Sequence, residues 1–186
     1  MKRLRVWFVC VVLLFGCSAE EDSMERALAL RNRMQAADGC SFDATVTSDY
    51  GAYLHSFVLR CQTDAAGTVR FEVIAPDTIS GITGTIEKDR GKLTFDEEVL
   101  AFSPLADGQL APVTAPWILI RTLLGGYITS CGDSGNGLQL FIDDSYADNA
   151  LTLEICLDEQ DLPRTAEIIW RGRRILTMQI ENFQML

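Results

Sequence analysis

Two side chains in this sequence could together carry out nucleophilic chemistry. Ser134 lies in the short segment from Cys131 to Gly135, and the sequence contains one histidine, His55. A serine hydroxyl becomes an effective nucleophile only when a nearby base removes its proton, and histidine is the commonest such base. The pair therefore raises the possibility of a serine hydrolase.

The surroundings of both residues argue against that chemistry. The segment around Ser134 resembles the nucleophile loop of chymotrypsin-like proteases, but Asn136 stands where that motif has its second glycine. His55 lacks the Ala-Ala-His-Cys context of the base in that family, and the chain is short for two barrels. Gly, Ser and Asn gather in loops for backbone reasons. We predict that Ser134 lies in a loop, that His55 is a partly buried strand residue, and that the protein is not an enzyme.

Three groups of carboxylates could in principle bind a cation. Calcium loops place their oxygen ligands at fixed positions along about twelve residues, and none of the groups follows that spacing. Each group lies where a turn or a strand end is predicted, so we expect solvated surface and neither a metal nor a cofactor. The groups are Asp96-Glu97-Glu98, Asp143-Asp144 with Asp148, and Asp158-Glu159 with Asp161.

Cys17 has the sequence context of a lipid-modified cysteine. Three cations within the first five residues precede an apolar run from Val6 to Phe15, the order of an export signal. The run has ten residues, whereas a membrane-spanning helix needs about 20. It ends in Leu14-Phe15-Gly16-Cys17, which resembles a lipobox. We predict a signal peptide over residues 1–16, a diacylated Cys17, a linker over 17–22 and one domain over 23–186, with an ordinary signal peptide as the alternative.

The cysteines that remain after export are expected to form disulfides. Cys40 and Cys61 flank two alternating segments that fold about a turn at 49–51, so we predict that they lie opposite each other in a hairpin. Elimination then pairs Cys131 with Cys156, and free buried thiols are the alternative. The sequence has no Cys-x-x-Cys spacing, and His55 lies apart from the cysteines, so zinc is disfavoured.

The charge of the chain limits its partners. Cleavage after residue 16 leaves 170 residues with 13 basic and 26 acidic side chains, a formal net charge of −13. Nucleic acids and anionic lipid surfaces both require a basic face, so we predict no nucleic-acid partner and membrane attachment through the lipid alone. The expected location is the extracytoplasmic face of the cell membrane.

The mature chain is predicted to begin with one helix and to continue as strands. Asp22 with Glu25 can form a capping box, and Gly39 supplies a stop, so residues 23–37 are a predicted helix. Its apolar face would contain Ala27, Leu30, Met34 and Ala37. Alternation of apolar and polar residues then predicts strands over 42–46, 53–60, 69–73, 82–88, 92–95 and 98–102.

A second helix interrupts the strands. Pro116 opens the apolar segment 117–124 and Gly125-Gly126 closes it, and apolar residues on nearly every side predict burial on more than one face. Strands are predicted again over 138–143, 151–157, 164–170 and 173–182. The fold class is therefore α+β, a large antiparallel sheet with two helices.

The order of elements resembles the LolA/LolB-like lipoprotein-carrier fold over residues 24–183. The resemblance depends on the helix before the first hairpin, on Phe71-Glu72-Val73-Ile74-Ala75-Pro76 with Ser80-Gly81, and on 157–163 before a final hairpin that ends at Asn182-Phe183. Gram-positive lipoprotein members, including the germination lipoprotein GerS, look most similar. The resemblance implies a strongly curved half-barrel with both helices on its concave face, and binding rather than chemistry.

Two binding roles follow from this resemblance. One is docking of an envelope or spore-cortex protein, which we favour, and the other is uptake of acyl chains or lipoproteins in a hydrophobic groove. The possible groove-lining residues are Phe71, Trp117, Ile120, Leu123, Leu124 and Trp170. Arg164, Arg171, Arg173 and Arg174 form the one cationic cluster and are expected at a solvated hairpin tip, with contact to an acidic partner or lipid headgroups as the alternative.

Overall fold

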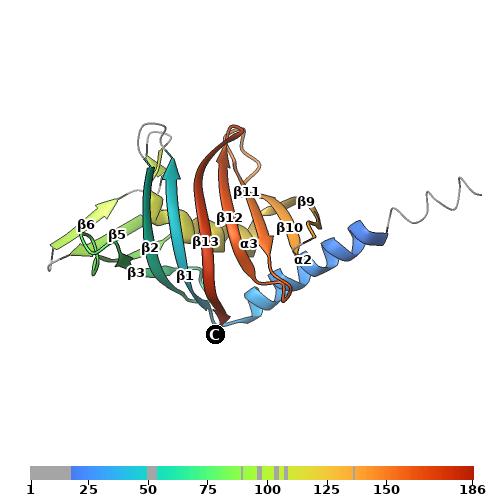
Figure 1. The fold of residues 1–186 in the computed structure, drawn as a ribbon, viewed down its shortest axis with the longest axis horizontal. Helices are drawn as coiled ribbons and strands as arrows, with labels where there is room; N and C mark the ends of the chain where they lie inside the picture. Colours follow the sequence, from blue (N-terminus) through green and yellow to red (C-terminus); the bar gives the residue numbers. More distant parts are fainter. Residues whose placement is uncertain are drawn as a thin grey trace, which may run out of the picture.

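One antiparallel sheet of eleven strands forms the framework of the molecule, with β6 at one edge and β9 at the other (Figure 1). A computed structural model describes residues 18–49, 54–88, 90–95, 98–102, 105–106, 109–135 and 137–186. The strand order is β6-β5-β4-β3-β2-β1-β13-β12-β11-β10-β9, and the sheet is not closed into a barrel. The predicted α+β class and large curved sheet are confirmed.

The strands follow one another mostly as hairpins. The first six are β1 (Cys40–Asp49), β2 (Leu54–Thr63), β3 (Val69–Ala75), β4 (Thr83–Glu87), β5 (Arg90–Phe95) and β6 (Glu98–Phe102). After the small pair β7 (Leu105–Ala106) and β8 (Gln109–Leu110) come β9 (Tyr127–Asp133), β10 (Leu138–Asp143), β11 (Leu151–Leu157), β12 (Pro163–Trp170) and β13 (Arg173–Met185). The hairpin order is interrupted between β6 and β9, which lie at opposite edges of the sheet, and the two halves join where β1 pairs with the last strand, β13.

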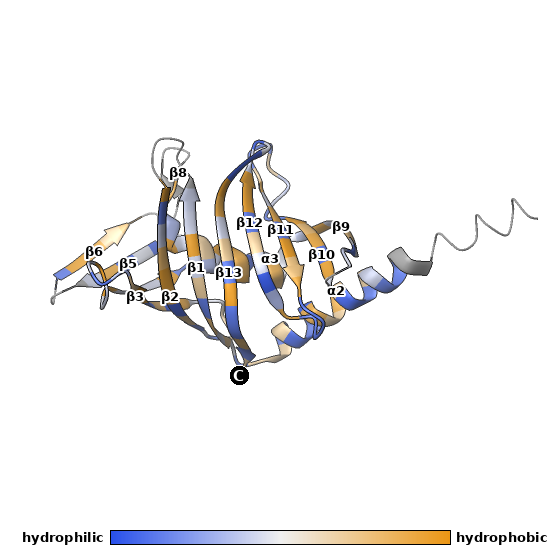
Figure 2. Cartoon of the chain, viewed as in Figure 1, coloured by the Kyte–Doolittle hydropathy of each residue, from blue (hydrophilic) through white to orange (hydrophobic). Residues whose placement is uncertain are grey.

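The two faces of the sheet differ in burial because successive side chains along a strand point to opposite faces. In β11, Leu151, Leu153 and Ile155 are buried, whereas Thr152 and Glu154 between them are half-buried. Figure 2 shows the same alternation of hydrophobic and hydrophilic residues along the central strands. We call the face with the buried residues the inner face and the other the outer face.

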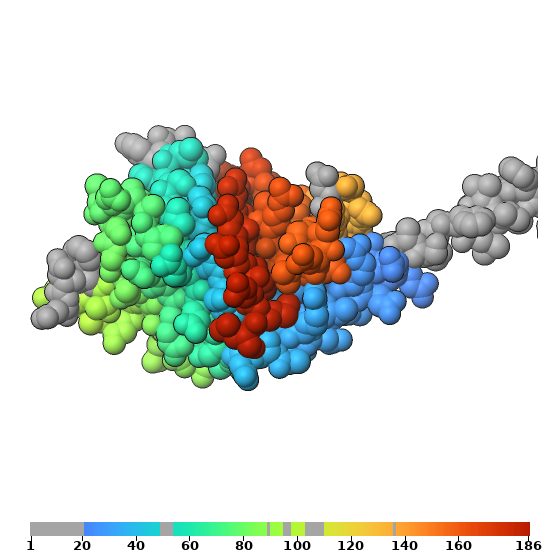
Figure 3. All heavy atoms as spheres, turned by 60° about the horizontal axis from the view of Figure 1, so that its bottom comes forward, coloured from blue at the N-terminus to red at the C-terminus, as the bar shows by residue number. Residues whose placement is uncertain are grey.

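The first helix, α2 (Ser18–Ala36), begins five residues before the predicted start. Asp22, expected as the cap, lies inside the helix, and the acidic residues Glu21 and Asp22 favour an earlier start because carboxylates stabilise a helix N-terminus. The predicted face is confirmed for Ala27, Leu30 and Met34, which are buried. Figure 3 shows α2 beside the C-terminal strands.

The second helix, α3 (Ala115–Gly125), follows a 3-10 turn over Pro112–Thr114 and lies against the inner face. Figure 1 shows it crossing behind the central strands. The helix includes Arg121 and Thr122, so it is not uniformly apolar. Neither helix in the described part of the chain has the length and apolar composition that crossing a bilayer requires.

Candidate functional site

The residues proposed to line a groove on the inner face are packed into the core. Trp117, Ile120 and Leu123 of α3 are 6, 1 and 3 % exposed, and Phe71 is buried against the same cluster. Leu124 and Trp170 are partly buried and pack against the edge of that core. The cavity that Ile120 and Leu124 line has a volume of about 10 Å³. That is the space of roughly one water molecule.

Two polar side chains of α2 hold α3 in this position. The Nε of Arg31 donates to the carbonyl oxygen of Leu123 at 2.8 Å, and the Nε2 of Gln35 donates to that of Leu124 at 2.9 Å. Both bonds satisfy carbonyls in the last turn of α3, where a cation also interacts favourably with the helix dipole. Burial lowers the pKa of the Arg31 guanidinium. The two helices therefore form one connected layer over the inner face.

The predicted disulfides are not formed in this structure. In the β1–β2 hairpin Cys61 lies opposite Phe42, and Cys40 donates its backbone N–H to the Thr63 hydroxyl at 2.9 Å. Cys40 and Cys61 are thus displaced by two residues along the strands. Cys131 pairs with Leu140, a buried residue of the inner face, whereas Cys156 pairs with Gln139 on the outer face. Strand β10 separates that second pair.

We expect Cys40 and Cys61 to resist alkylation in the folded protein. Burial raises the pKa of both thiols, so little reactive thiolate exists at pH 8. Mass spectrometry after iodoacetamide treatment at pH 8 should show modification of the half-buried Cys131 and Cys156 before Cys40 and Cys61, and of all four in guanidinium. Equal labelling rates, or a Cys40–Cys61 linked peptide under non-reducing conditions, would contradict this arrangement.

Ser134 and His55 lie far apart. Ser134 follows β9 and His55 lies in β2, with five strands between them, so at about 4.8 Å per strand spacing they are more than ~25 Å apart along the sheet. The Ser134 hydroxyl donates to the Gly137 carbonyl at 3.0 Å, and Asp133 Oδ1 accepts from the Gly135 N–H at 2.8 Å. The predicted loop at Ser134 is confirmed. The prediction of partial burial was wrong for His55, which is exposed on its strand.

Four residues of the three acidic groups, Asp143, Asp144, Asp158 and Asp161, form hydrogen bonds or ion pairs within the protein. Asp158 Oδ1 accepts from the N–H groups of Gln160 and Leu162 at 2.8 and 3.0 Å, and Asp161 pairs with Arg26 at 2.6 Å. Asp144 accepts from the N–H of Leu151 and pairs with Arg121, and Asp143 accepts from the Thr152 hydroxyl at 2.7 Å. Asp148, Glu159 and Glu98 are exposed, whereas Asp96 and Glu97 lie outside the described residues.

The predicted arginine cluster is divided between the two ends of β12. Arg164 follows the first residue of that strand, whereas Arg171, Arg173 and Arg174 surround the turn after it. Eight residues of strand separate the ends by more than ~20 Å. At the turn, the Arg171 guanidinium lies 4.7 Å from the centre of the Trp170 ring, and Arg174 pairs with Glu167 at 2.8 Å. The turn itself is exposed, as expected.

A polar cleft of about 840 Å³ lies beside α2 and the loops after β9 and β11. Arg26 and Arg164 supply its positive charge, and Asp133, Asp158 and Glu159 supply its negative charge. Arg26 is already paired with Asp161. Because the cleft contains side chains of both charges, it favours neither a cationic nor an anionic ligand.

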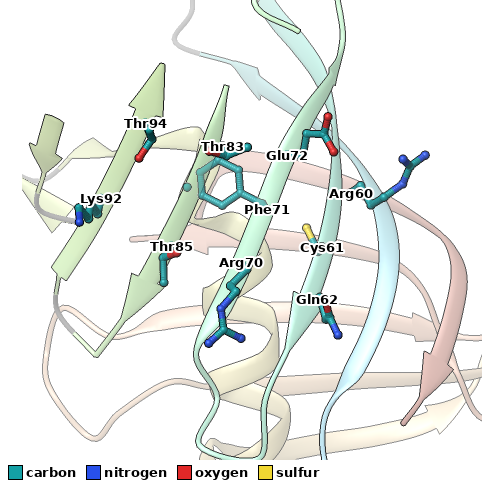
Figure 4. Close-up of a pocket in the computed structure, with 11 residues that line it drawn as sticks. Arg60, Cys61, Gln62, Arg70, Phe71, Glu72, Thr83, Thr85, Lys92 and Thr94 are labelled. Atoms are coloured by element: carbon teal, nitrogen blue, oxygen red, sulfur yellow. The ribbon is translucent and has the colours of Figure 1, made fainter. Parts of the chain in front are cut away.

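A second hollow, of about 420 Å³, lies on the outer face of β2–β5 (Figure 4). Its cations are Arg60, Arg70 and Lys92, against one carboxylate, Glu72, in a chain whose net charge is −10. Three short threonine side chains also line the hollow and leave space beside the long charged ones: Thr83, Thr85 and Thr94. We call this site the outer hollow.

The pairing of the strands brings the residues of the outer hollow together. One row across the sheet contains Arg60, Glu72, Thr83 and Thr94, and the next contains Gln62, Arg70, Thr85 and Lys92. Arg60 pairs with Asp43 at 3.5 Å and Arg70 with Asp64 at 3.9 Å, whereas Lys92 has no ion pair with a described residue. Sequence alone shows that these residues alternate with buried ones, but not that they share a row.

No protein-family model matches the sequence, and a comparison with curated proteins gives no match. Solved structures with a similar course of the chain include a LolA superfamily protein from Nitrosomonas europaea, 7 % identical with a TM-score of 0.44 over 86 % of this chain and 93 % of that one. A DUF1329 family protein from Desulfovibrio piger is 6 % identical with a TM-score of 0.49 over 90 % and 93 %. The lipoprotein LppX from Mycobacterium tuberculosis is 10 % identical with a TM-score of 0.40 over 87 % and 93 %. A protein of the LolA superfamily, the family that the sequence resembles, is among these structures.

Proposed function

We propose that the protein is a non-catalytic binding module of the cell envelope that docks a protein partner. The observation that carries this proposal is the burial of α3 on the inner face, where an acyl chain would otherwise lie. Pockets for small ligands usually have volumes of about 300–1,000 Å³. The cavity beside Ile120 and Leu124 is far smaller, at about 10 Å³.

Opening this face for a lipid would be costly. Moving α3 away would break the hydrogen bonds from Arg31 and Gln35, each with a net value of about 0.5–1.5 kcal/mol. It would also expose Trp117 and Leu123, at about 1.5–3 kcal/mol for each large apolar side chain. A protein partner that binds outside the core requires none of this rearrangement.

Lipid binding can be measured directly on residues 18–186, produced without the anchor and purified without detergent. Native mass spectrometry should give the mass of the polypeptide alone, and a dansylated undecanoic acid should show no saturable fluorescence increase. Trp117→Ala, which removes a buried ring, is the control that opens space for the probe. Stoichiometric binding by the unaltered protein would replace the docking role with the alternative, a carrier of acyl chains.

The proposal includes the absence of catalysis, and Ser134 is the residue to test. Ser134→Ala should leave binding and stability unchanged, because the hydroxyl only donates a hydrogen bond to the Gly137 carbonyl in an exposed turn. A fluorophosphonate probe should not label the purified protein. Stoichiometric labelling that disappears in the variant would identify Ser134 as a nucleophile and refute the proposal.

The proposed location depends on Cys17, which lies outside the described residues. Cys17→Ser should abolish diacylation, so the protein should accumulate as precursor or leave the membrane fraction. Labelling with an alkyne palmitate followed by fractionation tests this. Unchanged labelling and unchanged fractionation would show that the anchor is elsewhere.

A further inference from the structure

The two edges of the sheet differ in how they are protected. An unpaired edge strand presents backbone N–H and C=O groups that can pair with another chain, and proteins usually cover or charge such edges. At the β9 edge, α2 lies alongside the strand. The β6 edge has no neighbouring strand beyond it within the described residues.

The exposed edge is also apolar. Val99 and Leu100 of β6 are 53 and 63 % exposed and project to opposite faces of the sheet, Val99 beside Thr94 and Leu100 beside Leu93. Glu98 is the one charged residue of the strand. Exposed apolar residues on a regular edge are typical of surfaces that bind protein.

The cations next to this edge indicate the charge of its partner. Lys92 lies opposite Ala101 on the outer face, and Arg90 lies two residues before it along β5; both are exposed. Lys92 has no ion pair with a described residue and also belongs to the outer hollow, where cations outnumber carboxylates. An acidic side chain beside Ala101 would find this ammonium group within reach.

We propose that β6 is a docking edge, to which an extended segment of another protein adds as a twelfth strand. The segment would place apolar side chains against Leu100 and an acidic side chain towards Lys92. A second copy of this chain is a poorer occupant, because copies with a net charge of −10 repel each other. This inference rests on the proposed docking role and names its surface.

The test uses two labelled ten-residue peptides that are built to be extended, one alternating valine with glutamate and the other valine with lysine. In fluorescence anisotropy at low salt, the glutamate peptide should bind about tenfold more tightly than the lysine peptide. Lys92→Glu should remove that preference. Leu100→Asn should weaken binding about tenfold, whereas Leu54→Asn, at a leucine on β2 that is 72 % exposed, should not.

Hydrogen exchange identifies how the peptide binds. Amides of residues 98–102 should exchange more slowly in the complex if the peptide adds as a strand. Equal affinities for Leu100→Asn and Leu54→Asn, or no protection of β6, would overturn the proposal. A dimer that Leu100→Asn dissociates would also overturn it in favour of a second copy. Acyl-chain binding, which the separate lipid-binding experiment measures and the peptide assay does not, would instead refute the docking role itself.

Discussion

Leu119→Asp should unfold the protein or leave it only marginally stable. Leu119 lies in the middle of α3, is 0 % exposed and belongs to the core between that helix and the sheet. A buried carboxylate without a partner costs several kcal/mol, either as a desolvated charge or as an unpaired acid. A domain of this kind is stable by only about 5–15 kcal/mol in total.

Urea unfolding followed by circular dichroism measures this effect. Leu28→Asp is the matched control, because Leu28 lies on α2 and is 45 % exposed, so its midpoint should barely move. The milder Leu119→Ala should still fold and lose about 2–5 kcal/mol. An unchanged midpoint for Leu119→Asp would mean that α3 does not cover the inner face.

Gly39→Ala should destabilise the fold by at least about 3 kcal/mol, because backbone strain and steric overlap add together. Gly39 turns the chain from α2 into β1 with a φ of +153°, a conformation that other residues rarely adopt. A Cβ there would lie 2.1 Å from the carbonyl oxygen of Thr63, which is backbone and cannot move aside easily. The corner is further fixed by the Leu186 N–H, which donates to the Gly39 carbonyl at 3.0 Å.

Gly132→Ala provides the comparison for this substitution. Gly132 lies in β9, and a Cβ there would meet nothing within 4 Å. Its effect should stay within about 0.5 kcal/mol. Similar unfolding free energies for the two variants, measured in the same urea titration, would show that the corner at Gly39 is not as tight as the structure indicates.

Much of the fold could be predicted because burial follows local periodicity. Leu151, Leu153 and Ile155 alternate with polar residues, and Ala27, Leu30 and Met34 recur at helical spacing, so both patterns identify their elements. Strand β9 gave no such signal. It is an edge strand in which no side chain is fully buried, and its sequence contains Gly132 and several polar residues. Local sequence alone could not identify it.

The candidate sites depend on register, which local patterns do not determine. Symmetry about residues 49–51 placed Cys40 opposite Cys61, but the hairpin pairs Phe42 with Cys61. A shift of two residues leaves both cysteines on the inner face and removes the disulfide. The outer hollow depends on register in the same way, because Arg70 and Lys92 share a row only through two successive strand pairings.

The pairing of β1 with β13 has a consequence for how the chain is made. Strand β1 leaves the ribosome well before its neighbour β13, which is formed by residues 173–185. Until that segment emerges, the centre of the sheet lacks one of its strands, and β1 has a free side. Contacts between residues so far apart in sequence also slow folding. The sheet should therefore stay incomplete on the ribosome until residues 173–185 have emerged.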